Sequence, residues 1–343
     1  MLSSFISKFS AKASESNKIT TAVIDKAQIL EAVKFARDEM KFELLSDIAC
    51  VDNLNLNKSK RFSLYYIFSS LKGSNFIIQV DLDESESIAS VSQIYKSANW
   101  AERECYDQYG VKFANHPNLR RILNHKDFIG HPLRKDYPID KYQILTQSDS
   151  LVDEMRDQLL SLGLASEEND EFKIKYTFLN IGPSHPATHG TIRNFMALDG
   201  EKIAACVTEI GYLHRGFEKS CETHTYAQII PYTDRLNYCS AMLNNVGYAK
   251  AVEDILGVSI PDRAIFMRVI LGELARIIDH EVCLGAMFVD MGALTNSAQK
   301  YKYFTMTIEY KYEKSNYPRP IITFNQQNTT PEMFYKTSTA VPN

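Results

Sequence analysis

A chain of 343 residues is long enough for two domains, and its composition does not indicate disorder or a fibrous protein. The formal net charge of −4 is too small to indicate a nucleic-acid-binding protein. Charged residues interrupt every apolar run, as Arg268 does within 264–271, so no segment is predicted to span a bilayer. Any connection to a membrane is therefore expected through partner proteins.

The cysteine pattern excludes two common metal centres. The six cysteines are widely scattered and no two form a C-x-x-C pair, so neither a zinc ribbon nor a set of iron–sulfur ligands is visible. Buried free thiols are the expected state. The N-terminus lacks the charged opening and long apolar run of a secretory signal, and residues 1–20 are predicted to form a flexible tail.

The first half of the chain predicts a mixed α/β domain over residues 21–145. Near-helical spacing of apolar residues predicts a helix, strand-like runs follow it, and a second helix comes next. Beyond that helix the periodicity is lost through Pro117, Pro132 and Pro138, which indicates an extended docking arm. The predicted helices lie at 28–40 and 100–109, and the predicted strands at 42–51, 61–71 and 75–82.

A polar, partly helical linker is predicted over 146–172, with its helix at 151–162. A second domain over 173–294 opens with a strand at 173–180 and a hairpin that turns at Asp199-Gly200. It continues in two long helices at 235–256 and 261–294, the second with Pro261 in its first turn. The predicted fold class is therefore α+β.

The last segment, 295–343, differs abruptly from the helices before it. It is rich in Tyr, Lys, Asn and Thr and shows no persistent helical stripe. We expect an atypical tail here, for which disorder is one alternative.

The most informative motif is IGPSHPATHG at 181–190, which places His185 and His189 four residues apart. On a helix such a pair would share a face and form half of a metal site. Pro186, however, removes a backbone donor and favours an extended conformation before it, and Gly190 tolerates turn dihedrals. The motif therefore predicts a turn between strands that displays both imidazoles. A zinc hydrolase is disfavoured because no Glu lies between the histidines to act as base.

Arg235 and Tyr238 are a second candidate pair, because residues three apart share a face in the first turn of the predicted helix. A phenol can donate a hydrogen bond or proton, and a guanidinium can stabilise a negatively charged neighbour. From the spacing alone, an interfacial tyrosine and a surface arginine are the favoured interpretation. The charges at 102–104 with Asp107 are expected to form a surface charge cluster.

Asp290 is the third candidate. Its helical neighbours Cys283, Ala286, Met287 and Leu294 give it a largely apolar face. A carboxylate buried on such a face needs a partner, because an unpaired buried charge costs several kcal/mol. An imidazole would serve as that partner. The alternative is an acid at a helix end that reaches solvent.

Taken together, these segments resemble the C-type and D-type subunits of bacterial NADH-quinone oxidoreductase, the respiratory complex I. The C-type resemblance lies at 102–110, 116–123 and 130–138, and the D-type resemblance at 182–190, 211–219, 232–238 and 272–294. The single-chain order is similar to the fused C/D subunit of some bacteria. The D-type proteins are related to the large subunit of nickel–iron hydrogenases, but the paired C-x-x-C ligands of those enzymes are missing here.

The resemblance implies roles for the candidate residues. His189 would contact the quinone headgroup from the loop, and Tyr238 would contact it from the other side. Asp290 would orient that histidine, and Arg235 would lie beside the terminal iron–sulfur cluster. His185 shares the loop and would belong to the same quinone site. No metal ligand is expected in this chain.

The resemblance also implies partners and a location. This chain would bind no cofactor alone, quinone would be the substrate, and a neighbouring B-type subunit would hold the iron–sulfur cluster. An I-type ferredoxin-like subunit and the membrane-arm H-type subunit would be further partners, on the cytoplasmic side of the bacterial inner membrane. The expected function is energy-coupled electron transfer from NADH to quinone.

The D-type resemblance stops after about residue 294, and residues 295–343 resemble nothing in the family. A truncated or frameshifted gene is the explanation that the sequence favours. The alternative to a catalytic subunit is therefore a non-catalytic product that docks only through its C-like half.

Overall fold

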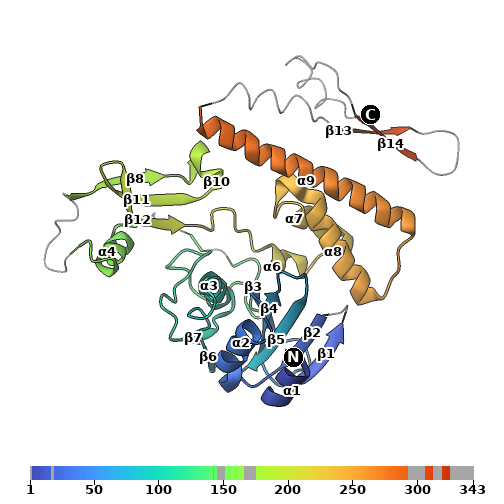
Figure 1. Ribbon diagram of the computed structural model, residues 1–343, viewed down its shortest axis with the longest axis horizontal. Helices are drawn as coiled ribbons and strands as arrows, with labels where there is room; N and C mark the ends of the chain where they lie inside the picture. Colours follow the sequence, from blue (N-terminus) through green and yellow to red (C-terminus); the bar gives the residue numbers. More distant parts are fainter. Residues whose placement is uncertain are drawn as a thin grey trace. The chain divides into compact units, whose positions relative to one another are not determined.

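The computed structural model describes residues 2–16, 19–141, 143–144, 151–165 and 175–292, and the backbone of 306–311 and 319–324. The chain divides into two compact units, Met1–Thr223 and His224–Asn343 (Figure 1). The predicted second domain at 173–294 is therefore divided between these units. The fold contains both sheets and helices, as the mixed α and β pattern of the sequence predicts.

A five-stranded sheet forms the larger core of the first unit. Its strand order is β1-β2-β5-β4-β3, with β2 and β5 parallel and the other neighbours antiparallel. The bounds are β1 Lys12–Ser16, β2 Ile19–Val23, β3 Leu44–Asp52, β4 Phe62–Ser69 and β5 Asn75–Leu82. In β5 every second residue is buried, because successive side chains of a strand point to opposite faces.

Helices pack on this sheet and complete the core. The bounds are α1 Leu2–Phe9, the 3-10 turn η1 Lys26–Gln28, α2 Ile29–Asp38 and α3 Ala98–Tyr109. In α2 the buried residues Ile29, Ala32, Val33 and Ala36 follow helical spacing. The short strands β6 Ser87–Ala89 and β7 Lys112–Ala114 pair in parallel beside α3.

The prediction of a flexible tail over residues 1–20 is wrong in the structure. This stretch forms α1 and β1 and begins β2, and the rings of Phe5 and Phe9 are buried in the core. The ring centroids of Phe5 and Phe76 lie 5.1 Å apart in an edge-to-face arrangement. Aromatic burial holds the segment even though its composition is polar and rich in serine.

The predicted arm, residues 115–141, folds back against α3. It contains no helix or strand among its described residues, as predicted, but it does not project from the unit. The backbone N–H of Leu133 donates to the carbonyl of Gln108 at 3.2 Å, and Arg134 Nε donates to that of Tyr109 at 2.6 Å. The arm is thus tied to the C-terminal end of α3.

A second, smaller core lies in the same unit. The strands β8 Thr177–Ile181, β11 Arg193–Asp199 and β12 Lys202–Glu209 form an antiparallel sheet of order β12-β11-β8. Helix α4, Val152–Ser161, covers it with the buried side chains of Met155 and Leu159. The helix predicted as part of a linker is therefore a packed element, because its apolar stripe meets the apolar face of the sheet. Helix α6, Phe217–Cys221, follows this sheet in the chain.

The second unit is helical in its first part (Figure 1). It contains α7 Tyr226–Thr233, the 3-10 turn η3 Tyr238–Ser240, α8 Ala241–Leu256 and α9 Asp262–Asp290. Gly272 of α9 lies close to α8, since an added Cβ there would meet Leu243 Cδ2 at 3.1 Å. Pro261 precedes α9 as its N-cap residue, one position earlier than predicted.

Near the C-terminus, β13 Met306–Lys311 and β14 Arg319–Phe324 form an antiparallel hairpin. The prediction of an atypical tail, with disorder as one alternative, covers 295–343, and apart from this hairpin it falls outside the described residues. None of the described helices, α9 included, combines the length and hydropathy that a membrane span requires.

Candidate functional site

The histidine motif forms a small hairpin, as its proline and glycine predict. Strand β9, Ser184–His185, pairs antiparallel with β10, Gly190–Thr191, and the 3-10 turn η2, Pro186–Thr188, joins them. His185 lies opposite Gly190 in this register. Both imidazoles are exposed, so the loop displays them to solvent in this chain.

His185 has a structural role in this hairpin. The backbone N–H of Ala187 donates to His185 Nδ1 at 3.1 Å, and the Thr188 hydroxyl donates to the His185 carbonyl at 2.6 Å. Because Nδ1 accepts a hydrogen bond, the proton of the neutral ring lies on Nε2. His185 therefore keeps one nitrogen, Nε2, for a ligand.

His189 occupies a conformation that few residues adopt. Its φ of 51° and ψ of 30° lie in the left-handed region, where His is one of the better tolerated non-glycine residues. At the base of the hairpin Gly182 has φ +95°, and a Cβ there would lie 1.9 Å from the Ile192 carbonyl oxygen. The backbone thus fixes the direction of the His189 side chain at the tip.

Arg235 and Tyr238 do not open a long helix. They lie in the turn between α7 and α8, where Tyr238 begins η3 and α8 starts only at Ala241. Arg235 Nη1 lies 2.8 Å from Asp234 Oδ1 and also donates to the Pro231 carbonyl at the end of α7. The prediction that the two residues share the first turn of a long helix is wrong, because α8 begins only after both of them.

Tyr238 is 69% exposed and Asp290, the last residue of α9, is also exposed. The turn that carries Tyr238 contacts α9 at Asp279, well before the end of that helix, where Asn237 Nδ2 lies 3.4 Å from Asp279 Oδ2. Asp290 follows Asp279 by 11 residues, which corresponds to about 16 Å along the helix axis. Asp290 thus lies exposed at the C-terminal end of α9 in this chain.

The five candidate residues therefore lie in three separate places. The structure brings His185 and His189 together in one hairpin, within the first unit. Arg235 and Tyr238 share one turn, and Asp290 lies elsewhere on the second unit. Across the described ranges of both units, no three or more His, Cys, Asp or Glu side chains form a group that could hold a metal ion.

The charges at 102–107, which the sequence suggests to be a surface cluster, are partly in the core. Glu102 and Asp107 are fully buried. Burial raises the pKa of Glu102 to about 7, although hydrogen bonds from Ser90 and the Val91 N–H oppose this. The helical spacing of Ala98, Glu102 and Cys105 was the available signal, because it places Glu102 on the apolar face of α3.

Asp107 organises the arm. Its carboxylate accepts hydrogen bonds from the backbone N–H groups of Ile122, Leu123 and Asn124 at 3.0, 2.9 and 2.9 Å, and from Arg121 Nη1 at 2.7 Å. Burial by itself would raise the pKa of Asp107, but these hydrogen bonds outweigh it and the pKa is lowered. Asp107 is thus an ionised anchor in the interior.

The segment at 211–219, part of the D-type resemblance, packs on the arm. Lys219 Nζ donates to the Arg134 carbonyl at 2.8 Å, and Lys135 forms an ion pair of 2.6 Å with Glu222. Gly211 has φ +104°, and a Cβ there would lie 2.3 Å from the Leu123 carbonyl oxygen. Contacts between these two segments follow from tertiary packing and have no signal in local sequence.

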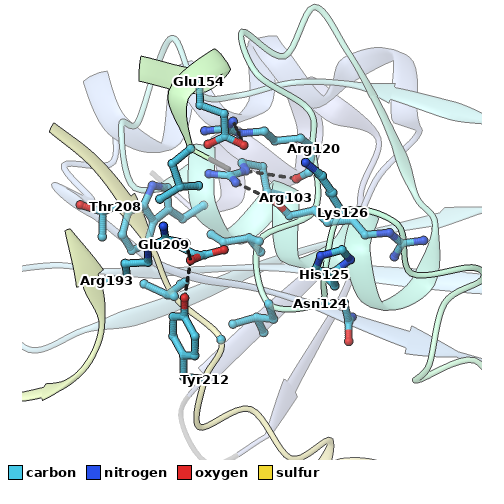
Figure 2. Close-up of a pocket in the computed structure, with 17 residues that line it drawn as sticks. Arg103, Arg120, Asn124, His125, Lys126, Glu154, Arg193, Thr208, Glu209 and Tyr212 are labelled. Carbon is cyan, nitrogen blue, oxygen red and sulfur yellow. Dashed lines mark hydrogen bonds and ion pairs between the residues drawn. The ribbon is translucent and has the colours of Figure 1, made fainter. Parts of the chain in front are cut away.

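A cavity that the sequence does not predict lies in the same unit. Arg103 and Arg120 line it together with Glu154 of α4 (Figure 2). Glu209, the last residue of β12, and Tyr212, three residues further along the chain, also line it. The Tyr212 hydroxyl donates to Glu209, and burial together with this contact raises the pKa of Tyr212 to about 12.

Residues 22–143 match the family model described as the 30-kDa subunit of respiratory-chain NADH dehydrogenase. The C/D subunit of NADH-quinone oxidoreductase from Bdellovibrio bacteriovorus is 47% identical over 291 residues, which are 82% of this chain and 50% of that protein. The C/D subunit from Buchnera aphidicola is 37% identical over 287 residues, which are 79% of this chain and 49% of that protein.

Among solved structures, a trypsin-resistant fragment of Nqo5 aligns with 34% of this chain and 96% of its own, with 27% identity and a TM-score of 0.33. The chain spans about half the length of the curated relatives that it matches. By these sequence similarities, the chain resembles the fused C/D subunits of NADH-quinone oxidoreductase.

Proposed function

We propose that this chain is a peripheral-arm component of an NADH:quinone oxidoreductase and that its histidine hairpin forms part of the quinone-reduction site. The observation that carries the proposal is the hairpin itself, which holds His189 at an exposed tip in a chain related to the C/D subunits. A quinone headgroup has two carbonyl oxygens, and each needs a hydrogen-bond donor that can also supply a proton. Imidazole and phenol groups meet this need.

In this proposal His189 donates to one quinone carbonyl and Tyr238 to the other. Both side chains are exposed in this chain, which suits groups that meet a substrate. His185 supports the hairpin through its Nδ1 and presents Nε2 to the same site. Asp290 orients His189, and Arg235 lies near the electron donor, as the family resemblance implies.

The electron donor is an iron–sulfur cluster of a neighbouring B-type subunit, which supplies the electrons that reach quinone. This chain supplies hydrogen bonds, protons and shape, and the energy of the reaction is coupled to proton translocation by the whole complex. I-type and H-type subunits are the other partners, at the cytoplasmic side of the bacterial inner membrane. The exposed apolar side chains of α9, including Phe266 and Val269, offer surface for partner subunits.

The test uses His189→Asn and Tyr238→Phe at the corresponding positions of an intact homologous complex. Asn tolerates the left-handed backbone of residue 189 but does not titrate, and Phe removes only the hydroxyl. We expect NADH:quinone activity to fall by about 100-fold or more, the usual range for loss of a general acid. Electron transfer from NADH to ferricyanide should be retained.

Matched control variants are His280→Asn on α9 and Tyr226→Phe on α7, whose side chains are exposed and lie outside the proposed site. Equal loss of both activities would indicate failed assembly, which the amount of this polypeptide in the purified complex would reveal. Full quinone reduction by both test variants, His189→Asn and Tyr238→Phe, would refute the proposal and would favour a chain that only docks.

A further inference from the structure

The cavity beside Arg103 and Arg120 has the size and the polarity of a ligand site. Its volume is about 460 Å³, within the usual range of small-molecule pockets. Trp100 and Arg103 of α3, the arm from Arg120 to Lys126, and α4 form part of its wall (Figure 2). None of the candidate quinone-site residues lines it.

Positive charge predominates in the lining. Five Lys and Arg residues line the cavity, against two carboxylates, Glu154 and Glu209. Among the described residues, carboxylates pair with three of these cations: Glu154 with Arg120 at 2.7 Å, Glu209 with Arg193 at 3.2 Å, and the buried Asp107 with Arg121 at 2.7 Å.

Two backbone carbonyls of the arm hold the side chain of Arg103. Its Nε donates to the Arg120 carbonyl at 3.1 Å and its Nη2 to the Arg121 carbonyl at 2.9 Å. Within the described part of the chain, no carboxylate lies within ion-pair distance of it. Two carbonyl contacts therefore hold the guanidinium rigidly while its charge remains available to a ligand.

Arg120 adds an unused donor at the same place. Its Nε is buried and finds no hydrogen-bond acceptor among the residues that the structure describes. A buried donor without an acceptor costs free energy. Burial first, and then the charge of Arg120, lower the pKa of Arg103 to about 10, although the charges of Glu154 and Asp107 oppose this.

We propose that this cavity binds a phosphate group, in a site formed by Arg103 and Arg120 and bordered by Trp100. A doubly charged phosphate monoester matches the excess of cations better than a single carboxylate, and its oxygens accept from the guanidinium groups of Arg103 and Arg120. Trp100 is 52% exposed and offers an apolar surface to the organic part of the ligand. The phosphate belongs either to a small phosphorylated molecule or to a phospholipid headgroup.

Trp100 is the only tryptophan of the chain, so its fluorescence reports directly on this cavity. The purified chain is titrated with pyrophosphate and with glycerol phosphate at constant ionic strength, with chloride as the comparison anion. We expect a saturable change with both phosphates and none with chloride, and weaker binding as the salt concentration rises. An identical response to chloride would overturn the proposal.

Two variants with opposite expected effects sharpen the test. Arg120→Gln removes the charge and should weaken phosphate binding by roughly tenfold or more, the usual effect of losing a charged hydrogen bond. Glu154→Gln removes the carboxylate that competes for Arg120, so phosphate binding should become tighter. Arg276→Gln, an exposed residue of α9, is the control and should bind as the wild type does.

Unchanged affinity in folded Arg120→Gln overturns the proposal. If circular dichroism shows that this variant does not fold, Glu154→Gln decides, and unchanged or weaker binding by it overturns the proposal. A last arm compares phosphatidylcholine vesicles with and without phosphatidic acid. A Trp100 response to phosphatidic acid vesicles alone identifies a lipid headgroup, a response to glycerol phosphate alone identifies a small molecule, and no response to either overturns the proposal.

Discussion

Arg121 Nη1 lies 2.7 Å from Oδ1 of the fully buried Asp107, and the next three backbone N–H groups of the chain donate to the other oxygen of this carboxylate. One side chain of α3 thereby holds the start of the arm in place. The arm in turn contacts Gly211 and α6, so Asp107 indirectly positions the segment that follows β12. The first predictions concern this arrangement.

Asp107→Asn should destabilise the first unit by about 3 kcal/mol, because a buried charged acceptor of several hydrogen bonds is replaced by a neutral amide. Urea denaturation followed by circular dichroism measures this change. Hydrogen exchange at Ile122, Leu123 and Asn124 should accelerate more than exchange in β4 and β5. Asp127→Asn is the control, since the Asp127 side chain is 77% exposed. Equal effects of the two substitutions would contradict the role given to Asp107.

Gly211→Ala should destabilise the protein more than Gly216→Ala does. Both glycines have positive φ, so both substitutions introduce backbone strain. Only at position 211 does the added Cβ meet another segment, at 2.3 Å from the Leu123 carbonyl oxygen, whereas nothing lies within 4 Å of it at position 216. Thermal unfolding of the two variants compares them, and equal losses of Tm would refute the close contact.

Glu102 predicts a pH dependence of stability. Below about pH 4.5 both the folded and the unfolded chain hold the proton, and above the folded pKa of about 7 both release it. Between these values only the folded chain keeps it, so the free energy of unfolding should fall as the pH rises from 4.5 to 7. The full difference is roughly 3 kcal/mol for this single group.

Glu102→Gln removes this titration and keeps an acceptor for the Val91 N–H. The free energy of unfolding, measured in urea at pH 5 and at pH 8, should therefore differ less between the two pH values in the variant. Glu84→Gln, whose side chain is 50% exposed, should keep the wild-type difference. A wild-type pH dependence in Glu102→Gln would show that Glu102 is already ionised at pH 5.

The helices α8 and α9 provide a prediction for the second unit. Arg268 donates from Nη1 and Nη2 to both oxygens of Glu253, at 2.9 and 2.6 Å, and both side chains are partly buried. A double-mutant cycle should give a coupling of about 1 kcal/mol for this bidentate pair. The exposed pair Arg276–Glu273 should give a coupling near zero. The reverse order would mean that geometry and burial do not decide the strength of these pairs.

Strands and helices with a regular apolar pattern could be predicted from the sequence. β5 lies at the predicted residues, and α3 ends at the predicted residue before Gly110, whose φ of +80° closes the helix. The histidine hairpin could also be predicted, because Pro186 and Gly190 restrict the backbone locally. In these cases neighbours in sequence provide the physical cause.

The start of α8 and the packing of α4 could not be predicted in the same way. Apolar periodicity continues through Arg235 and Tyr238, yet the turn η3 interrupts it because Asn237 and Ser240 bond to each other and η3 packs on α9. Helix α4 has the composition of a linker, but Met155 and Leu159 find the apolar face of β11 and β12.

The sequence by itself determined the family, the alternation of the central strands and the display of His185 and His189 at a turn. Only the tertiary structure decided which charges are buried, since Glu102 and Asp107 receive their hydrogen bonds from segments that lie 11 to 17 residues away. The same holds for the cavity that Arg103 of α3 and Arg120 of the arm line together. A charged group acts as a buried anchor or as a ligand-binding group when distant segments supply hydrogen-bond donors and exclude water. The local sequence pattern does not contain these contacts.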